Sequence, residues 1–79
     1  MTLAQYLKNK RQAQKLTQRE VGNALGFGSA HQFVSNWERG ACLPPLKKMK
    51  KLISLYKIDR EEMIEMILRD YEKQLRGVM

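Results

Sequence analysis

The residues of this sequence best suited to specific recognition chemistry lie between positions 31 and 36. Four of them have side chains that both donate and accept hydrogen bonds: His31, Gln32, Ser35 and Asn36. In a helix they share one face, opposite the face that carries Val34 and Trp37. Glutamine and asparagine pair bidentately with adenine in the major groove of DNA, and serine pairs with several base edges. The pattern predicts a DNA-reading helix face, and an uncommitted polar surface is the alternative interpretation.

Enzymatic and metal chemistry find little support in the sequence. It contains one histidine, His31, and one cysteine, Cys42, with no cluster of carboxylates near either. A single cysteine cannot form an internal disulfide or a cysteine-based zinc site. The Gly-Phe-Gly segment at 26–28 lacks the preceding strand, third glycine and lysine of a phosphate-binding loop. We therefore expect no catalytic residues, no metal site and no cofactor.

Charge is distributed unevenly along the 79 residues, which carry a net charge of +7. Residues 1–58 hold eleven lysines and arginines against two acids, a net +9, whereas residues 59–79 hold four against six, a net −2. A basic body predicts a polyanionic partner, with nucleic acid the first candidate and an anionic membrane the second. The basic residues are spread over several expected helices, which disfavours the membrane. A merely solvated basic surface is the remaining alternative.

Size and apolar content predict a single soluble domain over residues 1–79. No apolar run approaches the roughly 20 residues of a membrane span, and the N-terminus lacks the apolar core of a signal peptide. The lone cysteine fits a reducing compartment. We expect a cytoplasmic protein that makes no membrane contact.

Apolar periodicity and capping residues predict five helices and an all-α fold. The expected helices cover residues 3–15, 18–25, 30–39, 45–56 and 59–76. Capping boxes are expected at four helix starts, in the pairs Thr2–Gln5, Thr17–Glu20, Ser29–Gln32 and Asp59–Glu62. Gly26 and Gly40 are expected to end the second and third helices.

Three side chains around the third helix raise questions of packing. Arg11 lies on the apolar stripe of the first helix and needs a partner, for which Glu38 is the best candidate and solvent the alternative. Phe27 is expected to enter the core as the chain turns. Phe33 is expected either to pack inward or to touch a thymine methyl group or the sugar backbone.

The fourth helix divides into an apolar and a basic face. Its inner face is expected to consist of Leu46, Met49, Leu52, Ile53 and Tyr56. Its outer face carries Lys47, Lys48, Lys50 and Lys51. Two lysines in the first turn oppose the helix dipole, which favours nearby DNA phosphates over a solvated lysine face.

The last helix has more apolar residues than one narrow stripe needs. Some should pack on the core, and a seam of Ile64, Ile67 or Leu68, Tyr71 and Leu75 should continue beyond it. A seam of this kind predicts a second subunit docked on residues 64–75. The alternatives are an intramolecular cap over the bundle and a different protein partner.

Three blocks of sequence resemble a known family. They are L-T-Q-R-E-V-G-N-A-L-G at 16–26, V-S-N-W-E-R-G at 34–40 and L-P-P-L-K-K-M-K-K-L at 43–52. Together they resemble the lambda-repressor-like, XRE-type helix-turn-helix domain over roughly residues 3–63. The resemblance implies a compact five-helix bundle that binds double-stranded operator DNA, usually as a dimer, here with an extended C-terminal helix. The segment between Gly26 and Trp37 is two residues longer than the family's usual form.

The resemblance also implies roles for individual residues. Gln18 corresponds to a phosphate-holding residue, the polar face of the third helix to base-reading positions, and Arg39 to a backbone contact. Arg11 and Glu38 correspond to an ion pair between the first and third helices. With Lys47 and Lys48 as further phosphate contacts, the predicted DNA-binding set is Gln18, Ser29, His31, Gln32, Ser35, Asn36, Arg39, Lys47 and Lys48.

The expected function is that of a sequence-specific transcriptional regulator, a repressor that binds a two-fold operator through the third helix. Residues 1–58 would form the basic core bundle, and residues 59–76 the C-terminal helix that makes a homodimer. The alternative is an antitoxin or adaptor whose C-terminal helix binds another protein.

Overall fold

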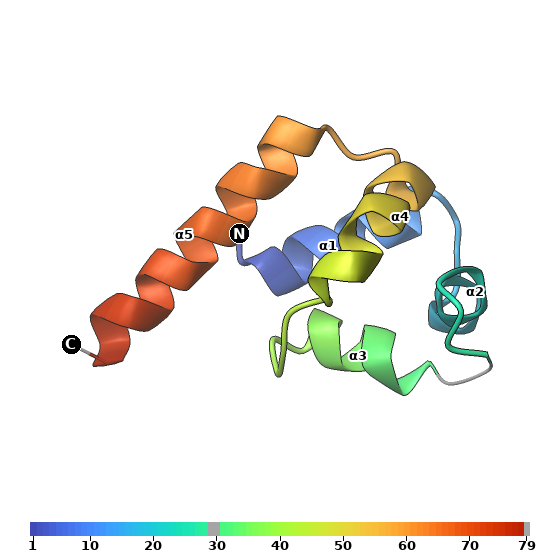
Figure 1. The fold of residues 1–79 in the computed structure, drawn as a ribbon, viewed down its shortest axis with the longest axis horizontal. Coiled ribbons are helices and arrows are strands. Elements are labelled where there is room, and N and C mark those ends of the chain that lie inside the picture. The colour runs from blue at the N-terminus through green and yellow to red at the C-terminus, as the bar shows by residue number, and fades with distance from the viewer. Residues whose placement is uncertain (29–30, 79) are drawn as a thin grey trace.

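The structure, a computed structural model, describes residues 1–28 and 31–78 (Figure 1). Within these ranges it contains no strand and five helices: α1 (Leu3–Ala13), α2 (Gln18–Ala24), α3 (Gln32–Glu38), α4 (Leu46–Tyr56) and α5 (Arg60–Val78). Helix α2 lies at one end of the molecule and α5 at the other, with α1, α3 and α4 between them (Figure 1). The all-α prediction is confirmed.

Two capping boxes form as the sequence predicted. The Thr2 hydroxyl accepts from the Gln5 amide N–H at 3.1 Å, and the Gln5 side chain accepts from the Thr2 N–H at 3.2 Å. The Thr17–Glu20 pair repeats this exchange at 3.0 and 2.9 Å at the start of α2. The expected end of the first helix at residue 15 is wrong, because Lys15 adopts a left-handed conformation (φ 58°) and α1 ends at Ala13.

The start of α3 differs from the prediction. The helix begins at Gln32 with His31 as its N-cap, and His31 makes no side-chain capping hydrogen bond. Gln32 is therefore the first residue of the helix and not the third, and the expected capping box with Ser29 falls outside the part of the chain that the structure describes. Ser29 and Ala30 lie outside the described residues. The helix ends as expected, with Gly40 in the left-handed region (φ 77°).

The first residue of α4 also differs from the prediction. Pro45 is the N-cap rather than a first-turn residue, and Leu46 is 88% exposed instead of facing inward. Leu46 precedes the turn of α4 that reaches the core, where Met49 makes the first contact. Apolar periodicity placed Leu46 on the correct face of the helix, but it did not indicate that this first turn lies too far from the core to be buried.

The expected capping box at the start of α5 is only half formed. The Asp59 carboxylate accepts from the Glu62 amide N–H at 3.3 Å. The Glu62 carboxylate accepts a hydrogen bond from the Tyr6 hydroxyl and lies 3.5 Å from the Lys10 ammonium. A tertiary contact with α1 therefore replaces the return bond. The helix continues to Val78, two residues beyond the expected end.

The core consists of buried side chains from all five helices and from the segments that follow α2 and α4. They are Leu3, Tyr6, Leu7, Val21, Leu25, Val34, Trp37, Leu52, Tyr56, Ile58 and Met63. The central helix is α1, which contacts α3, α4 and α5. Because α3 packs on α1, the position of α3 depends on the most interior helix of the bundle.

None of the helices in the described part of the chain is both long and apolar enough to span a membrane.

Candidate nucleic-acid interface

Helix α3 presents opposite faces to the core and to solvent. Val34 and Trp37 are fully or almost fully buried, as predicted. On the other side Gln32 is exposed, and Ser35 and Asn36 are partly exposed. Anchored by an aliphatic and an indole side chain, a helix of only seven residues can hold its polar face in a fixed direction.

A buried ion pair joins α3 to α1. The Arg11 Nε donates to Glu38 Oε2 at 2.6 Å, and the Arg11 Nη2 donates to Glu38 Oε1 at 3.0 Å. The Arg11 Nη1 donates to the Leu16 carbonyl at 2.7 Å, and the two charged side chains are 10% and 4% exposed. Hydrogen bonding to Glu38 raises the pKa of Arg11, despite the opposing effect of burial. The predicted pairing is confirmed, and bidentate geometry is the form in which such a pair is strongest.

The position of Gln18 adds a detail that the sequence did not reveal. Its side-chain Nε2 donates to the Glu38 Oε1 at 3.1 Å, so α2 is tied to the same carboxylate as α1. An amide nitrogen has two N–H groups, and the second can donate to another acceptor. Glu38 therefore orients the side chain predicted to hold a phosphate.

A shallow depression of about 400 Å³ lies between the end of α1, the start of α2 and the N-cap of α3. It is lined by Arg11, Lys15, Leu16, Thr17, Gln18, Arg19 and His31. The structure thus brings Gln18 and His31 together. It also adds Lys15 and Arg19, two basic residues that the sequence reasoning missed. The two residues flank the Thr17 cap in the sequence, and this signal could have identified them.

The opposite flank of α3 is formed by aromatic rings and a lysine. Phe27, half-buried against the core, stacks on Phe33 with ring centroids 4.7 Å apart and meets Trp37 edge-on at 6.0 Å. The Lys48 ammonium lies 5.3 Å from the centre of the Phe27 ring. It is also 3.5 Å from the place a β-carbon would occupy on Gly26. The start of α4 is therefore packed against the turn between α2 and α3.

Two predicted DNA-binding residues contact each other on the outward side of α3. The Arg39 guanidinium donates to the Asn36 side-chain carbonyl. A carbonyl oxygen has two lone pairs, so this contact leaves Asn36 one acceptor position and its amide donors. The arginine thereby brings positive charge to the edge of the polar face.

The predicted set thus falls into three neighbouring groups. Gln18 and His31 line the depression, Gln32, Ser35, Asn36 and Arg39 follow the outer side of α3, and Lys48 adjoins the turn. Lys47 is exposed beside Lys48, and Ser29 lies outside the described residues.

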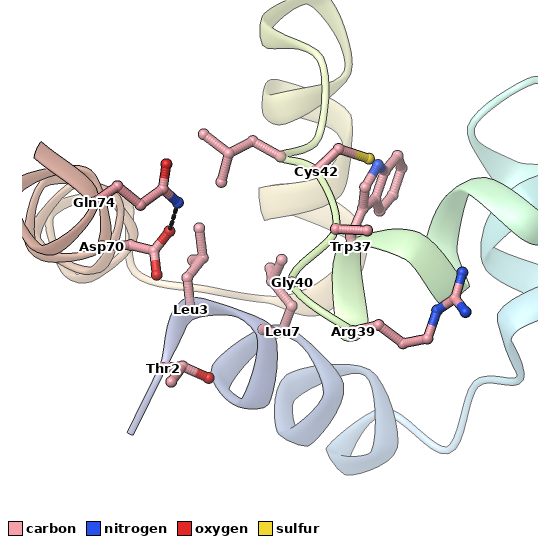
Figure 2. A pocket seen from close by; sticks show the side chains of 12 residues that line it. Thr2, Leu3, Leu7, Trp37, Arg39, Gly40, Cys42, Asp70 and Gln74 are labelled. Atoms are coloured by element: carbon pink, nitrogen blue, oxygen red, sulfur yellow. Dashed lines mark hydrogen bonds between the residues drawn. The ribbon is translucent and has the colours of Figure 1, made fainter. Parts of the chain in front are cut away.

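A larger cleft of about 560 Å³ lies elsewhere, between the start of α1, the loop after α3 and the distal part of α5 (Figure 2). Asp70 and Gln74 point toward it from α5 and are hydrogen-bonded to each other at 2.9 Å (Figure 2). Cys42 borders it from the loop. Of the predicted DNA-binding residues Arg39 lines this cleft, whereas Gln32, Ser35 and Asn36 do not. Its position therefore separates it from the polar face of α3.

The five-helix arrangement and the outward face of α3 define a helix-turn-helix DNA-binding domain of the lambda-repressor-like, XRE type. A helix-turn-helix family model matches residues 7–63, and the chain belongs to that family. The matched residues run from the middle of α1 to the start of α5 and include all of α2, α3 and α4. No curated protein and no solved structure gives a significant match. The family is one of DNA-binding regulatory domains, and the protein is a DNA-binding transcription regulator of the XRE type.

Proposed function

We propose that this protein is a sequence-specific repressor that places α3 in the major groove of a two-fold operator. The observation that carries the proposal is the inward position of Glu38, the acidic residue of α3. Its carboxylate is buried and neutralised by Arg11, so the outer side of the helix presents polar groups and Arg39 to a polyanion. A carboxylate on that side would repel the phosphates of the groove walls.

Base contacts are assigned to the outer residues of α3. Gln32, Ser35 and Asn36 would read base edges, and His31 would contact the groove where the helix begins. Ser29 retains its predicted role at that same end.

Phosphate contacts are assigned to residues on both flanks of α3. Gln18, with Lys15 and Arg19 beside it, would hold one strand from the start of α2. Arg39, Lys47 and Lys48 would hold the backbone on the side of α4. These contacts set the register of the domain on DNA, whereas the base contacts set its sequence preference.

The base-reading role is tested by selecting binding sites from a random duplex library and then measuring the affinity of variants for the selected site. Gln32→Ala should weaken binding by about 1–3 kcal/mol for the preferred base at one position of the half-site and should leave affinity for other bases there almost unchanged. Arg19→Ala is the matched control. It should lower affinity uniformly across sequences and reduce the slope of log affinity against log salt concentration by about one.

Equal losses on all sequences for Gln32→Ala would remove its base-reading role. Failure of the library to yield any preferred site would contradict the proposed function as a whole.

Repression is tested separately from binding. A reporter whose promoter overlaps the selected site should lose expression when the protein is produced, because the bound domain excludes polymerase. Increased expression would identify an activator. The cytoplasmic location stays a prediction.

The partner proposed for α5 is a second copy of the chain. The helix is about 28 Å long, and an exposed apolar seam runs along it from its second turn: Ile64 is 43% exposed, Leu68 62%, Tyr71 56% and Leu75 46%. These residues follow helical spacing within the predicted interface at 64–75. Joining two copies along α5 would present two α3 helices to half-sites about one DNA turn apart.

The dimer is tested by sedimentation of the full chain and of Leu68→Glu. The native chain should be dimeric at micromolar concentration and the variant monomeric, because two carboxylates would face each other across an apolar seam. The variant should still unfold cooperatively, since Leu68 is exposed in the monomer, but at a lower melting temperature that no longer depends on protein concentration, because dimerisation stabilises only the native chain. Monomeric behaviour of the native chain would contradict the homodimer. It would favour the alternative of an antitoxin or adaptor whose α5 binds another protein.

A further inference from the structure

The side chain of Phe33 is an unexplained apolar group on the DNA-facing side of the molecule. It is 47% exposed, although it belongs to the short recognition helix and adjoins the polar face. It follows Gln32 by about 100° around the helix and lies one turn before Asn36. Half of a phenyl ring is therefore presented beside the two amide side chains proposed to read bases.

This ring is held in place by its neighbour. Phe33 stacks on Phe27 at 4.7 Å with an angle of 29° between the ring planes. Phe27 is in turn braced by Trp37 from the core and by the Lys48 ammonium. A side chain fixed by stacking loses little further conformational freedom on binding, so its contacts are made at low entropic cost.

The chemistry of the major groove offers one apolar group to such a ring. Thymine carries a C5-methyl group there, and the other groups on the base edges are hydrogen-bond donors and acceptors. Glutamine and asparagine favour adenine, whose partner is thymine, so a methyl group lies close to the adenine that either residue would read. A ring beside Gln32 and Asn36 can contact that methyl group or that of the adjacent base pair.

We infer that Phe33 is a specificity-determining residue that reads a thymine methyl group next to the bases read by Gln32 and Asn36. The inference rests on the proposed function, because it requires α3 to lie in the major groove. Phe33 would thus add an apolar contact to the hydrogen bonds proposed for Gln32 and Asn36. Its ring is held by stacking on Phe27 as well as by the helix backbone.

The experiment replaces each thymine of the selected site, one at a time, with deoxyuridine. This change removes the methyl group and leaves every hydrogen-bonding group in place. The native protein should lose about fourfold in affinity at one thymine of each half-site, as expected for one buried methyl group. Phe33→Ala should bind the thymine and deoxyuridine forms of that position equally well.

Two further variants complete the test. Phe33→Leu keeps an apolar side chain and should retain part of the discrimination at that position. Lys47→Ala is the matched control, which should bind all sites more weakly and keep the full thymine preference. Both Phe33 variants should remain folded at the assay temperature, with the melting temperature lowered more by Phe33→Ala than by Phe33→Leu, because the ring is half exposed but stacks on Phe27.

Three results would overturn the inference while leaving the proposed function intact. The native protein could bind the selected site without any thymine-to-deoxyuridine effect. The effect could persist undiminished in Phe33→Ala. The alanine variant could instead lose affinity equally on all sequences, which would place the ring against the sugar–phosphate backbone. Absence of any selected site is a different outcome and would reject the proposed function itself.

Discussion

Helices α3 and α5 differ in length and in the contacts that hold them in place. α3 has seven residues and is fixed from several sides, by Val34 and Trp37 in the core and by Arg11 and Gln18 on its carboxylate. α5 has 19 residues and is fixed near its start, by the buried Met63 and the contacts of Glu62 with α1. The short helix is thus held by tertiary contacts along its whole length, whereas the long one packs on the core mainly in its first half, where Met66 and Ile67 are also half-buried.

The distal part of α5 is supported by contacts within the helix. Arg69 pairs with Glu65, Arg76 pairs with Glu72, and Gln74 donates to Asp70, each at a spacing of four residues. Such exposed pairs contribute only a few tenths of a kcal/mol each. Tertiary contacts are therefore concentrated on α3, the helix proposed to enter the major groove. The distal part of α5 leaves apolar surface exposed, where a partner is proposed to bind.

The largest effect should come from breaking the anchor of α3. Arg11→Ala leaves the Glu38 carboxylate buried without its cation and should destabilise the fold by about 3–5 kcal/mol. Denaturant titration measures the loss. Replacing both residues together, as Arg11→Met with Glu38→Leu, should recover most of it, because an apolar pair leaves no charge unpaired. An unchanged melting temperature for the single variant would contradict the anchoring role.

A smaller effect is expected from shortening α5. Truncation after Glu65 removes the seam together with Met66 and Ile67, which are half-buried against the core. The product should fold, sediment as a monomer and lose about 1–3 kcal/mol of stability from the lost apolar burial. Circular dichroism and sedimentation check both points. A truncated chain that remains dimeric would place the interface elsewhere.

The contact that ties α5 to α1 should be visible in the pH dependence of stability. The Tyr6 hydrogen bond is the main cause that lowers the pKa of Glu62 in the folded state. A lowered pKa gives stability that is present above the unfolded pKa of about 4.3 and is lost as pH falls through the folded value. Tyr6→Phe should therefore flatten the decline in the free energy of unfolding between about pH 5 and 3.

The same contact has an alkaline counterpart. Burial, with the Glu62 hydrogen bond second, raises the pKa of Tyr6. A raised pKa gives stability that is lost as pH rises above the unfolded value of about 10. Tyr71→Phe, on the exposed part of α5, is the matched control. Its free energy of unfolding should vary with pH as in the native protein, at both the acid and the alkaline end. If the free energy of unfolding of Tyr6→Phe and of the native protein declined with equal slope below about pH 5, the hydrogen bond would contribute nothing to stability.

The smallest effect is expected on the self-supported part of α5. Arg69→Ala breaks an exposed pair with Glu65 and should change the free energy of unfolding by less than about 0.5 kcal/mol. Raising the salt concentration should reduce even that difference. A loss comparable to that of Arg11→Ala would show that the two helices are stabilised in the same way.

Local sequence signals predicted a large part of this structure. The Thr2 and Thr17 capping boxes involve residues three apart, and both form. The Arg11–Glu38 pair spans 27 positions and was still predictable, because an arginine on an apolar stripe needs a carboxylate and few were available. The family resemblance pointed to the same pair.

Other features depended on distances that the sequence does not encode locally. The predicted start of α3 at residue 30 was two residues early, because His31 and not Ser29 is the N-cap of the helix. The Glu62 carboxylate bonds Tyr6 instead of the Asp59 backbone N–H, because Tyr6 lies within reach only after α1 and α5 have packed, whereas the Glu62 amide still donates to Asp59. The Gln18–Glu38 contact and the Phe27–Phe33 stack likewise join residues from different elements, so neither could be read from periodicity.

The separation of the two sides of α3 bears on how its target preference can change over evolution. The residues that aim the helix face inward, whereas Gln32, Ser35 and Asn36 have little part in the buried packing. Substitutions at these outer positions, which are proposed to read bases, should therefore alter the preferred DNA site with little loss of folding stability. Related domains can therefore diverge in the DNA sequence that they prefer while they keep the same fold.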